Sequence, residues 1–333
     1  MKVTEKKIDN LNRELTIEVA AADYVESENK KLAELRRKAD FKGFRKGMVP
    51  ASMIKRVYGE QVLVESVNQV IGKALDEHIS GNKLRILGEP LPSEKQPQNE
   101  WADGNDFTFV FDLGLSPEVS VEVEKGDTVP SYTVTVTAKD KAPMIENLKK
   151  YYEENKEENK EPKTDEEIDK EVTERLHAQY KSEADWRLTK DIRAFYIQKA
   201  GIELPEAFLK RWLVEANGGK LTAEDVEKDF PGFAEDFKWQ LVRGHLMQKW
   251  GFKVEEDDLR TQAEDFVRYQ YAMYGIGNVP DEMVRDSAMN MLHDQKQIER
   301  LSEQVEDRKV LDRIRETITL KPTKIGAAKF REL

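Results

Sequence analysis

Hydrophobic positions in the first third of the chain switch between two periods, which predicts a mixture of strands and helices. Every second residue is apolar at Phe107, Phe109 and Phe111, the clearest strand signal in the chain. The same alternation predicts further strands at about residues 3–8, 15–19, 83–87, 119–123 and 132–136. Helical spacing predicts helices at about residues 22–38, 50–58 and 60–81. Residues 1–125 are therefore expected to form an α+β domain, in which helices pack against an antiparallel sheet.

Beyond residue 125 the pattern becomes helical. Residues 126–140 are expected to form an extended linker, and residues 141–333 an elongated all-α domain with helical arms. A capping box at Thr164 and Glu167 predicts the start of a long helix that ends at Gly201. Its apolar residues recur every four positions, namely Ile168, Val172, Leu176, Tyr180, Ala184, Leu188 and Ile192. Proline and glycine residues, which begin or end helices, predict further helices at about residues 205–218, 222–230, 232–250, 257–274 and 280–317.

Composition fits an elongated protein and indicates the compartment in which it functions. Of the 333 residues, 38% are hydrophobic and 36% are charged, so the surface is extensive relative to the core. No apolar run of about 18 residues predicts a membrane span, and no apolar segment follows the N-terminal lysines as in a secretory signal. The chain has no cysteine, which excludes disulfides and thiolate metal sites and fits a reducing compartment. The expected location is the cytoplasm.

One segment reverses the sign of the charge. The chain has a formal net charge of −11, yet residues 41–59 contain five basic residues and no acidic one. Two glycines flank Phe44-Arg45-Lys46, so the backbone can form a tight exposed loop there. An aromatic ring between cations at a loop tip suits contact with RNA backbone and a small apolar cleft. An ordinary loop between helices, with Phe44 turned inward, is an equally open interpretation of the residue types alone.

The segment Gly43-Phe44-Arg45-Lys46-Gly47-Met48-Val49-Pro50 resembles the ribosome-binding signature of the trigger factor family of bacterial chaperones. The resemblance covers residues 1–125 well and extends to the helical pattern of about residues 140–333. It implies an ATP-independent chaperone that docks at the ribosomal exit tunnel, contacts protein and rRNA there, and holds nascent polypeptides. A homodimer off the ribosome is a further expected partner. The implied ribosome-binding residues are Gly43, Phe44, Arg45, Lys46, Gly47 and Pro50.

The chain departs from the family in one respect. Trigger factors usually carry an FKBP-type prolyl isomerase domain of roughly a hundred residues, but here strand-like residues 132–137 lead into helical sequence by Pro143. The isomerase domain and its activity are therefore expected to be absent. Three alternatives stay open: a prolyl isomerase like most relatives, a ribosome-independent assembly chaperone that acts as a dimer, and an extracytoplasmic parvulin-type chaperone. The missing signal segment disfavours the third.

A chaperone of this kind needs dispersed apolar residues on its arms. Candidates for binding client polypeptides are Met247, Trp250, Phe252, Met273, Tyr274, Met283, Met289 and Met291. Methionine adapts to varied partners, although the same helical spacing also describes residues that fill cores between helices. The four histidines are scattered without a metal-binding spacing, and no phosphate-binding loop is present. We therefore expect no catalytic residues, no metal and no cofactor.

Overall fold

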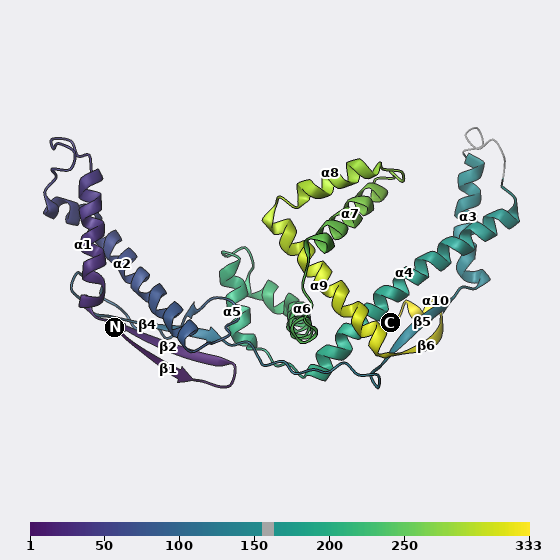
Figure 1. The fold of residues 1–333 in the computed structure, drawn as a ribbon, viewed down its shortest axis with the longest axis horizontal. Coiled ribbons are helices and arrows are strands. Elements are labelled where there is room, and N and C mark those ends of the chain that lie inside the picture. The colour runs from purple at the N-terminus through teal and green to yellow at the C-terminus, as the bar shows by residue number, and fades with distance from the viewer. Residues whose placement is uncertain (155–162) are drawn as a thin grey trace. The chain divides into compact units, whose positions relative to one another are not determined.

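The computed structural model describes residues 1–154 and 163–333 (Figure 1). Its two compact units are unit 1, residues 1–118 and 203–234, and unit 2, residues 119–202 and 235–333. The predicted succession of an α+β N-terminal part and a helical C-terminal part is confirmed. The domain bounds predicted from the sequence stay a prediction, because the compact units follow spatial contacts and are not continuous in sequence.

Unit 1 is built on a four-stranded antiparallel sheet with the strand order β1-β2-β4-β3. Its strands are β1 (Lys2–Lys7), β2 (Asn12–Val19), β3 (Leu91–Pro92) and β4 (Phe107–Gly114). The strands predicted at residues 83–87 and 119–123 are wrong. The first makes only an isolated bridge between Ile86 and Leu115, and the second has no neighbouring strand to pair with.

Two helices, α1 (Ala21–Lys38) and α2 (Ala51–Gly81), pack against this sheet. Their shared core consists of Ile17, Val19, Tyr24, Leu63, Val67, Ile71, Ala74 and Phe107. Figure 1 shows the loop between α1 and α2 at the end of this helical pair that lies away from the sheet. The sequence predicted a break at Gly59, but α2 continues through it. Burial of Ile54 before and Leu63 after the glycine outweighs the cost of about 1 kcal/mol for a helical glycine.

A fifth helix of the chain, α5 (Glu206–Ala216), completes unit 1 by packing on β4. Phe208 lies over Gly114, where an added Cβ would be 2.4 Å from the ring. Arg211 Nη1 donates to Asp112 Oδ2 at 2.7 Å. The helix that follows, α6 (Ala223–Trp250), contains Pro231, where the sequence predicted a boundary.

Unit 2 combines helices with a single pair of strands. Its elements, apart from the end of α6, are β5 (Thr128–Thr135), α3 (Ala138–Glu154), α4 (Asp165–Ala200), α7 (Glu256–Met273), α8 (Asp281–Met291), α9 (Gln295–Thr317), β6 (Thr319–Gly326) and α10 (Ala327–Phe330). Residues 126–140, expected as an extended linker, thus include β5. This strand pairs in parallel with β6, with Thr128 opposite Thr319. The sequence predicted the strand at residues 132–136, but not its pairing with a distant strand to form a small sheet in the helical unit.

Helix α4 bears out the pattern read from its sequence. The predicted capping box forms, because Glu167 N donates to Thr164 Oγ1 at 3.3 Å and Thr164 N donates to Glu167 Oε2 at 2.8 Å. The apolar residues at every fourth position are all buried. Each step of four residues turns about 40° past a full turn, so the buried stripe winds around the helix. Its first half, to Ala184, packs with β5, α3 and α10.

The pair α7 and α8 forms a helical hairpin that packs on α9. The hairpin core consists of Ala263, Val267, Val284, Ala288 and Leu301. Arg268 on α7 pairs with Asp281 on α8 at 2.8 Å and ties the two helices near their connection. Across the described ranges, no helix is long and apolar enough to cross a membrane.

Candidate functional site

Residues 39–50 join α1 to α2 through two successive turns of the same kind. In the first turn, Phe41–Phe44, the last N–H donates to the first C=O at 3.0 Å, and in the second, Arg45–Met48, at 2.8 Å. Each turn has glycine at its third position, with φ of +95° at Gly43 and +80° at Gly47. A type II turn requires positive φ at that position. The two Lys-Gly pairs of this segment are therefore turn signals.

The base of this loop is anchored in a small apolar cluster. Val49 is fully buried and packs with Ala39 and Ile54. The partly buried neighbours of this cluster are Leu32, Leu35, Phe41 and Tyr58. Arg36 Nε donates to the Val49 C=O at 2.8 Å, and the Pro50 C=O accepts from the N–H groups of Met53 and Ile54 in the first turn of α2. Pro50 thus begins α2, and the loop is held at both ends.

The tip of the loop points its side chains outward. Phe44 is 39% exposed, and Met48 is 66% exposed. The interpretation in which Phe44 turns inward therefore does not describe this loop. Arg45 and Lys46 are exposed too. Among the described residues neither forms an ion pair or a side-chain hydrogen bond, so both cations are available to a partner. All six residues predicted for ribosome binding lie in this one loop.

A buried carboxyl group lies in the middle of α1. Lys55, on the second turn of α2, pairs with Asp103. Glu28 on α1 is 2% exposed, and its Oε1 has no hydrogen-bond partner among the described residues. Burial raises the pKa of Glu28, and the nearby Asp103 carboxylate raises this pKa further, while Lys55 opposes the shift. Sequence reasoning missed this group, because nothing in the spacing places Asp103 beside α1.

The hairpin of α7 and α8 exposes a second group of large apolar side chains near its turn. Met273, Tyr274 and Met283, all predicted from the sequence, are 70%, 83% and 51% exposed. Tyr269 and Ile276 are exposed beside them and were not predicted. Tyr269 lies four residues before Met273 on the same helix face, so helical spacing would have found it. We call Tyr269, Met273, Tyr274, Ile276 and Met283 the arm-tip surface.

The remaining predicted client residues lie elsewhere in unit 2. Met247 is buried within α6 and is not accessible to a client in this structure. Trp250 and Phe252 are half-buried at the end of α6, with ring centroids 5.5 Å apart. Met291 packs against the hairpin core, whereas Met289 is 49% exposed. The structure therefore groups three of the eight predicted residues in the arm-tip surface.

No metal centre accompanies these surfaces. Within residues 1–154 and 163–333, no group of three or more His, Asp or Glu side chains is arranged to hold a metal ion. Between α1 and α2, burial raises the pKa of Glu28, and the hydrogen bond with Asp103 raises the pKa of Lys55. The geometry at the loop and at the arm tip suits binding, since both expose cationic or large apolar side chains to solvent.

Comparison with known proteins finds one family at both ends of the chain. Residues 1–148 match the family model "Bacterial trigger factor protein (TF)", and residues 184–333 match "Probable trigger factor, C-terminal domain". The trigger factor of Aliivibrio salmonicida is 32% identical over 150 residues, which are 45% of this chain and 34% of that protein. The trigger factor of Xanthobacter autotrophicus is 34% identical over 143 residues, 41% of this chain and 31% of that protein.

The fold has a solved counterpart. A structure described as "Promiscuous Substrate Recognition in Folding and Assembly Activities of the Trigger Factor Chaperone" matches with a TM-score of 0.54 and 14% identity. The match covers 95% of this chain and 99% of that one. The aligned part spans about a third of the length of the curated relatives. With matches to both its N-terminal and its C-terminal family models, this chain belongs to the trigger factor family.

Proposed function

We propose that the chain is an ATP-independent chaperone that docks on the ribosome through residues 43–50 and holds nascent polypeptides in the cytoplasm. The observation that carries this proposal is the loop tip, where the side chains of Phe44, Arg45 and Lys46 are exposed and the two cations form no ion pair or side-chain hydrogen bond among the described residues. One exposed aromatic side chain beside two unpaired cations offers a partner both apolar contact and positive charge at a single loop tip. Family membership makes the ribosome the partner to test first.

Electrostatics favours a partner that contains RNA. Residues 30–59 include ten Lys and Arg against only Glu34 and Asp40, a net +8 in a chain whose net charge is −11. Binding to a phosphate backbone releases counterions and gains affinity from each neutralised phosphate. The acidic remainder of the chain repels RNA, so contact is confined to this segment. Phe44 and Met48 add an apolar contact that suits a cleft on a ribosomal protein.

Cosedimentation with ribosomes tests the docking role. The triple variant Phe44→Ala/Arg45→Ala/Lys46→Ala is expected to lose at least tenfold in affinity. A matched control is Trp186→Ala/Lys190→Ala, because Trp186 is also an exposed aromatic (66%) with a cation 5.6 Å from its ring. The control is expected to pellet like the wild type. Equal pelleting of the triple variant and the wild type would remove the loop from the docking site.

Client holding is proposed for the arm-tip surface. Its five exposed side chains are methionine, tyrosine or isoleucine, and methionine adapts its shape to varied apolar partners. The replacement Met273→Ser/Tyr274→Ser is expected to weaken the suppression of aggregation of an unfolded protein, measured by light scattering. Trp186→Ser is the control, since it removes an exposed apolar side chain elsewhere in unit 2. Equal loss in both variants would show that general surface apolarity, and not this surface, binds clients.

We further propose that the chain is not a prolyl isomerase. The family models that it matches are those of the N-terminal and C-terminal domains. Strand β5 ends at Thr135 and α3 begins at Ala138, so a helix follows the strand directly. A proline-limited refolding assay tests this, and the expected rate with the chain present equals the uncatalysed rate. Clear acceleration would make the chain an enzyme.

A further inference from the structure

Within residues 1–154 and 163–333, strand β5 has a pairing partner on one edge only. The sheet of unit 2 consists of β5 and β6, and Thr319 N donates to the Asp127 C=O at 2.9 Å where the pair begins. The N–H and C=O of one residue face the same edge of a strand, and successive residues face opposite edges. From Asp127 onward, odd-numbered residues of β5 therefore face β6. The backbone groups of Tyr132 and Val134 face the other edge.

These outward groups have no partner within the described chain. Beyond the ladder with β6, no hydrogen bond among the described residues reaches the backbone N–H or C=O of Tyr132 or Val134. A row of unpaired backbone groups on a strand edge is a template for another strand. The two residues lie about 6.6 Å apart along the strand, the repeat of donors and acceptors on an extended chain.

The outer edge of β6 is interrupted by a proline and a lysine, whereas that of β5 is interrupted only near its start, by Pro130. Strand β6 carries Lys321 and Lys324, and by the same alternation Pro322 faces its outer edge and lacks a donor there. Lysine and proline are the residues by which edge strands avoid unwanted partners. Beyond Pro130, residues 131–135 of β5 contain neither charge nor proline. The open stretch of edge therefore lies on β5, at Tyr132 and Val134.

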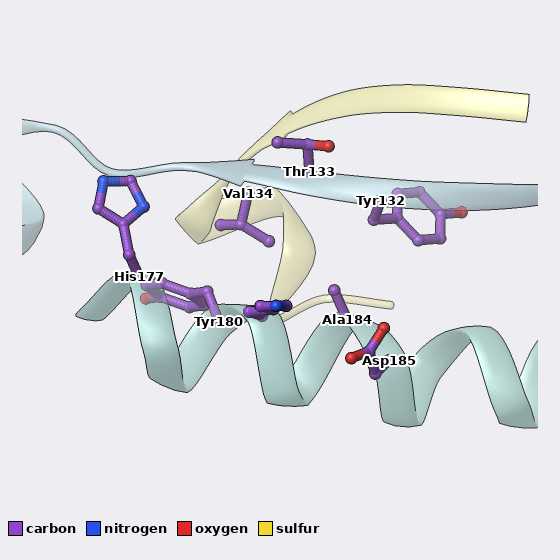
Figure 2. Close-up of a pocket in the computed structure, with 8 residues that line it drawn as sticks. Tyr132, Thr133, Val134, His177, Tyr180, Ala184 and Asp185 are labelled. Atoms are coloured by element: carbon purple, nitrogen blue, oxygen red, sulfur yellow. The ribbon is translucent and has the colours of Figure 1, made fainter. Parts of the chain in front are cut away.

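A pocket lies along this stretch of β5. Figure 2 shows the side chains of Tyr132 and Val134 directed from β5 toward α4, which forms the opposite wall. The residues drawn from α4 are His177, Tyr180, Lys181, Ala184 and Asp185. The pocket has a volume of about 310 Å³, at the small end of the range for ligand sites. Its size suits one apolar side chain of a neighbouring strand.

We propose that the free edge of β5 binds an extended segment of client polypeptide as a third strand, with one apolar side chain in the pocket against α4. The occupant is polypeptide because its backbone supplies donors and acceptors at the repeat of the edge. Recognition through backbone groups tolerates varied sequences, as a holding chaperone requires. The inference rests on the proposed client-holding function and adds a binding site separate from the arm-tip surface.

Amide hydrogen exchange of the full chain tests the site with a defined probe. The probe is a peptide of alternating Val and Thr, about eight residues long, and its fully N-methylated form is the control, because it keeps the side chains but lacks donors. With saturating peptide, exchange at Tyr132 and Val134 is expected to slow at least about tenfold. Exchange at Thr133, which faces β6, stays unchanged. Unchanged exchange at Tyr132 and Val134, or equal protection by the N-methylated peptide, overturns the proposal.

A pair of variants separates this site from client holding as a whole. Val134→Pro removes an outward N–H without removing a bond to β6, as Pro130 already does on the same edge. It is expected to abolish peptide protection at Tyr132, whereas Val134→Ala, which keeps the N–H, retains it. A wild-type chain that suppresses aggregation but shows no peptide protection overturns the edge site alone. Peptide protection without suppression of aggregation supports the edge site and overturns client holding.

Discussion

Replacing Asp127 with alanine is expected to destabilise unit 2, because this side chain ties the entry segment of unit 2 to the end of α4. Asp127 is 8% exposed. Its carboxylate accepts from Lys199 Nζ at 2.6 Å, Tyr196 Oη at 2.8 Å and Glu124 N at 2.9 Å. Its C=O accepts from Thr319 N at the start of β6. The residue thus connects the entry segment of unit 2, the end of α4 and the small sheet.

The size of the effect follows from the groups left behind. The Tyr196 side chain is fully buried, and an unsatisfied buried hydroxyl costs about 1–3 kcal/mol. Lys199 keeps some contact with water, so the loss of its ion pair adds only about 1 kcal/mol or less. The expected loss is about 1–4 kcal/mol in the free energy of unfolding. Urea denaturation followed by circular dichroism at neutral pH measures it.

Two comparisons check the reasoning. Asp185→Ala changes an exposed aspartate of α4 and should stay within about 0.5 kcal/mol of the wild type. Tyr196→Phe should cost about 1 kcal/mol in the wild type but little in Asp127→Ala, where the hydroxyl is already unpaired. If Asp127→Ala is no more damaging than Asp185→Ala, or if the two losses simply add, the account of this cluster is wrong.

The Asp127 cluster also predicts a dependence on pH. Burial opposes ionisation, but the hydrogen bonds from Lys199, Glu124 N–H and Tyr196 hold the pKa of Asp127 below its usual range. A lowered folded-state pKa means that the ionised group stabilises the fold above the unfolded value of about 3.9. This contribution is lost as pH falls through the folded-state pKa. The difference between wild type and Asp127→Ala should therefore shrink in acid.

Three further changes have defined expectations. Gly47→Ala should weaken ribosome binding several-fold, because a residue with a side chain pays about 1–2 kcal/mol to adopt φ of +80°. The control Gly72→Ala in α2, where an added Cβ meets nothing within 4 Å, should leave binding unchanged. Equal effects of the two variants in cosedimentation would contradict the turn geometry. Gly114→Ala should destabilise unit 1 by about 1–3 kcal/mol, because the added methyl group overlaps Phe208. Adding Phe208→Leu should restore part of the melting temperature, and no recovery would mean that Phe208 is not the source of the strain. Glu28→Gln should raise the stability of unit 1 at neutral pH, because burial raises the pKa of Glu28. Wild-type stability therefore falls as pH rises from about 4.3 through the folded-state pKa. If the urea midpoints of Glu28→Gln keep the wild-type pH dependence, Glu28 is not the source of that dependence.

Local signals in the sequence predicted local structure well. The capping box at Thr164 and the buried stripe of α4 depend on residues three and four positions apart, and both are present. The Lys-Gly pairs of the loop likewise determine their own turns. Gly59 and Pro231 show the limit of such signals. Each was read as a helix boundary, but packing of the flanking apolar residues keeps the helix continuous.

Contacts between distant segments were beyond the sequence pattern. Strands β5 and β6 pair across 190 residues, as in the bond from Thr135 Oγ1 to the Ile325 C=O. No spacing rule relates two segments so far apart. The packing of α5 on β4 was likewise not predictable, because it depends on the absence of a side chain at Gly114. The loop residues were found because one continuous segment holds them all, whereas the arm-tip surface is assembled from two helices and their turn.

The salt dependence of ribosome affinity tests the central claim most directly. Wild type is compared with Arg45→Gln/Lys46→Gln, which keeps Phe44 and removes only the two free charges of the loop tip. The account predicts that affinity falls steeply with salt in the wild type. In the variant, the slope of log affinity against log salt should be shallower by about one to two, since each lost phosphate contact removes roughly 0.7–0.9. An unchanged slope and affinity in the variant would contradict docking through this loop.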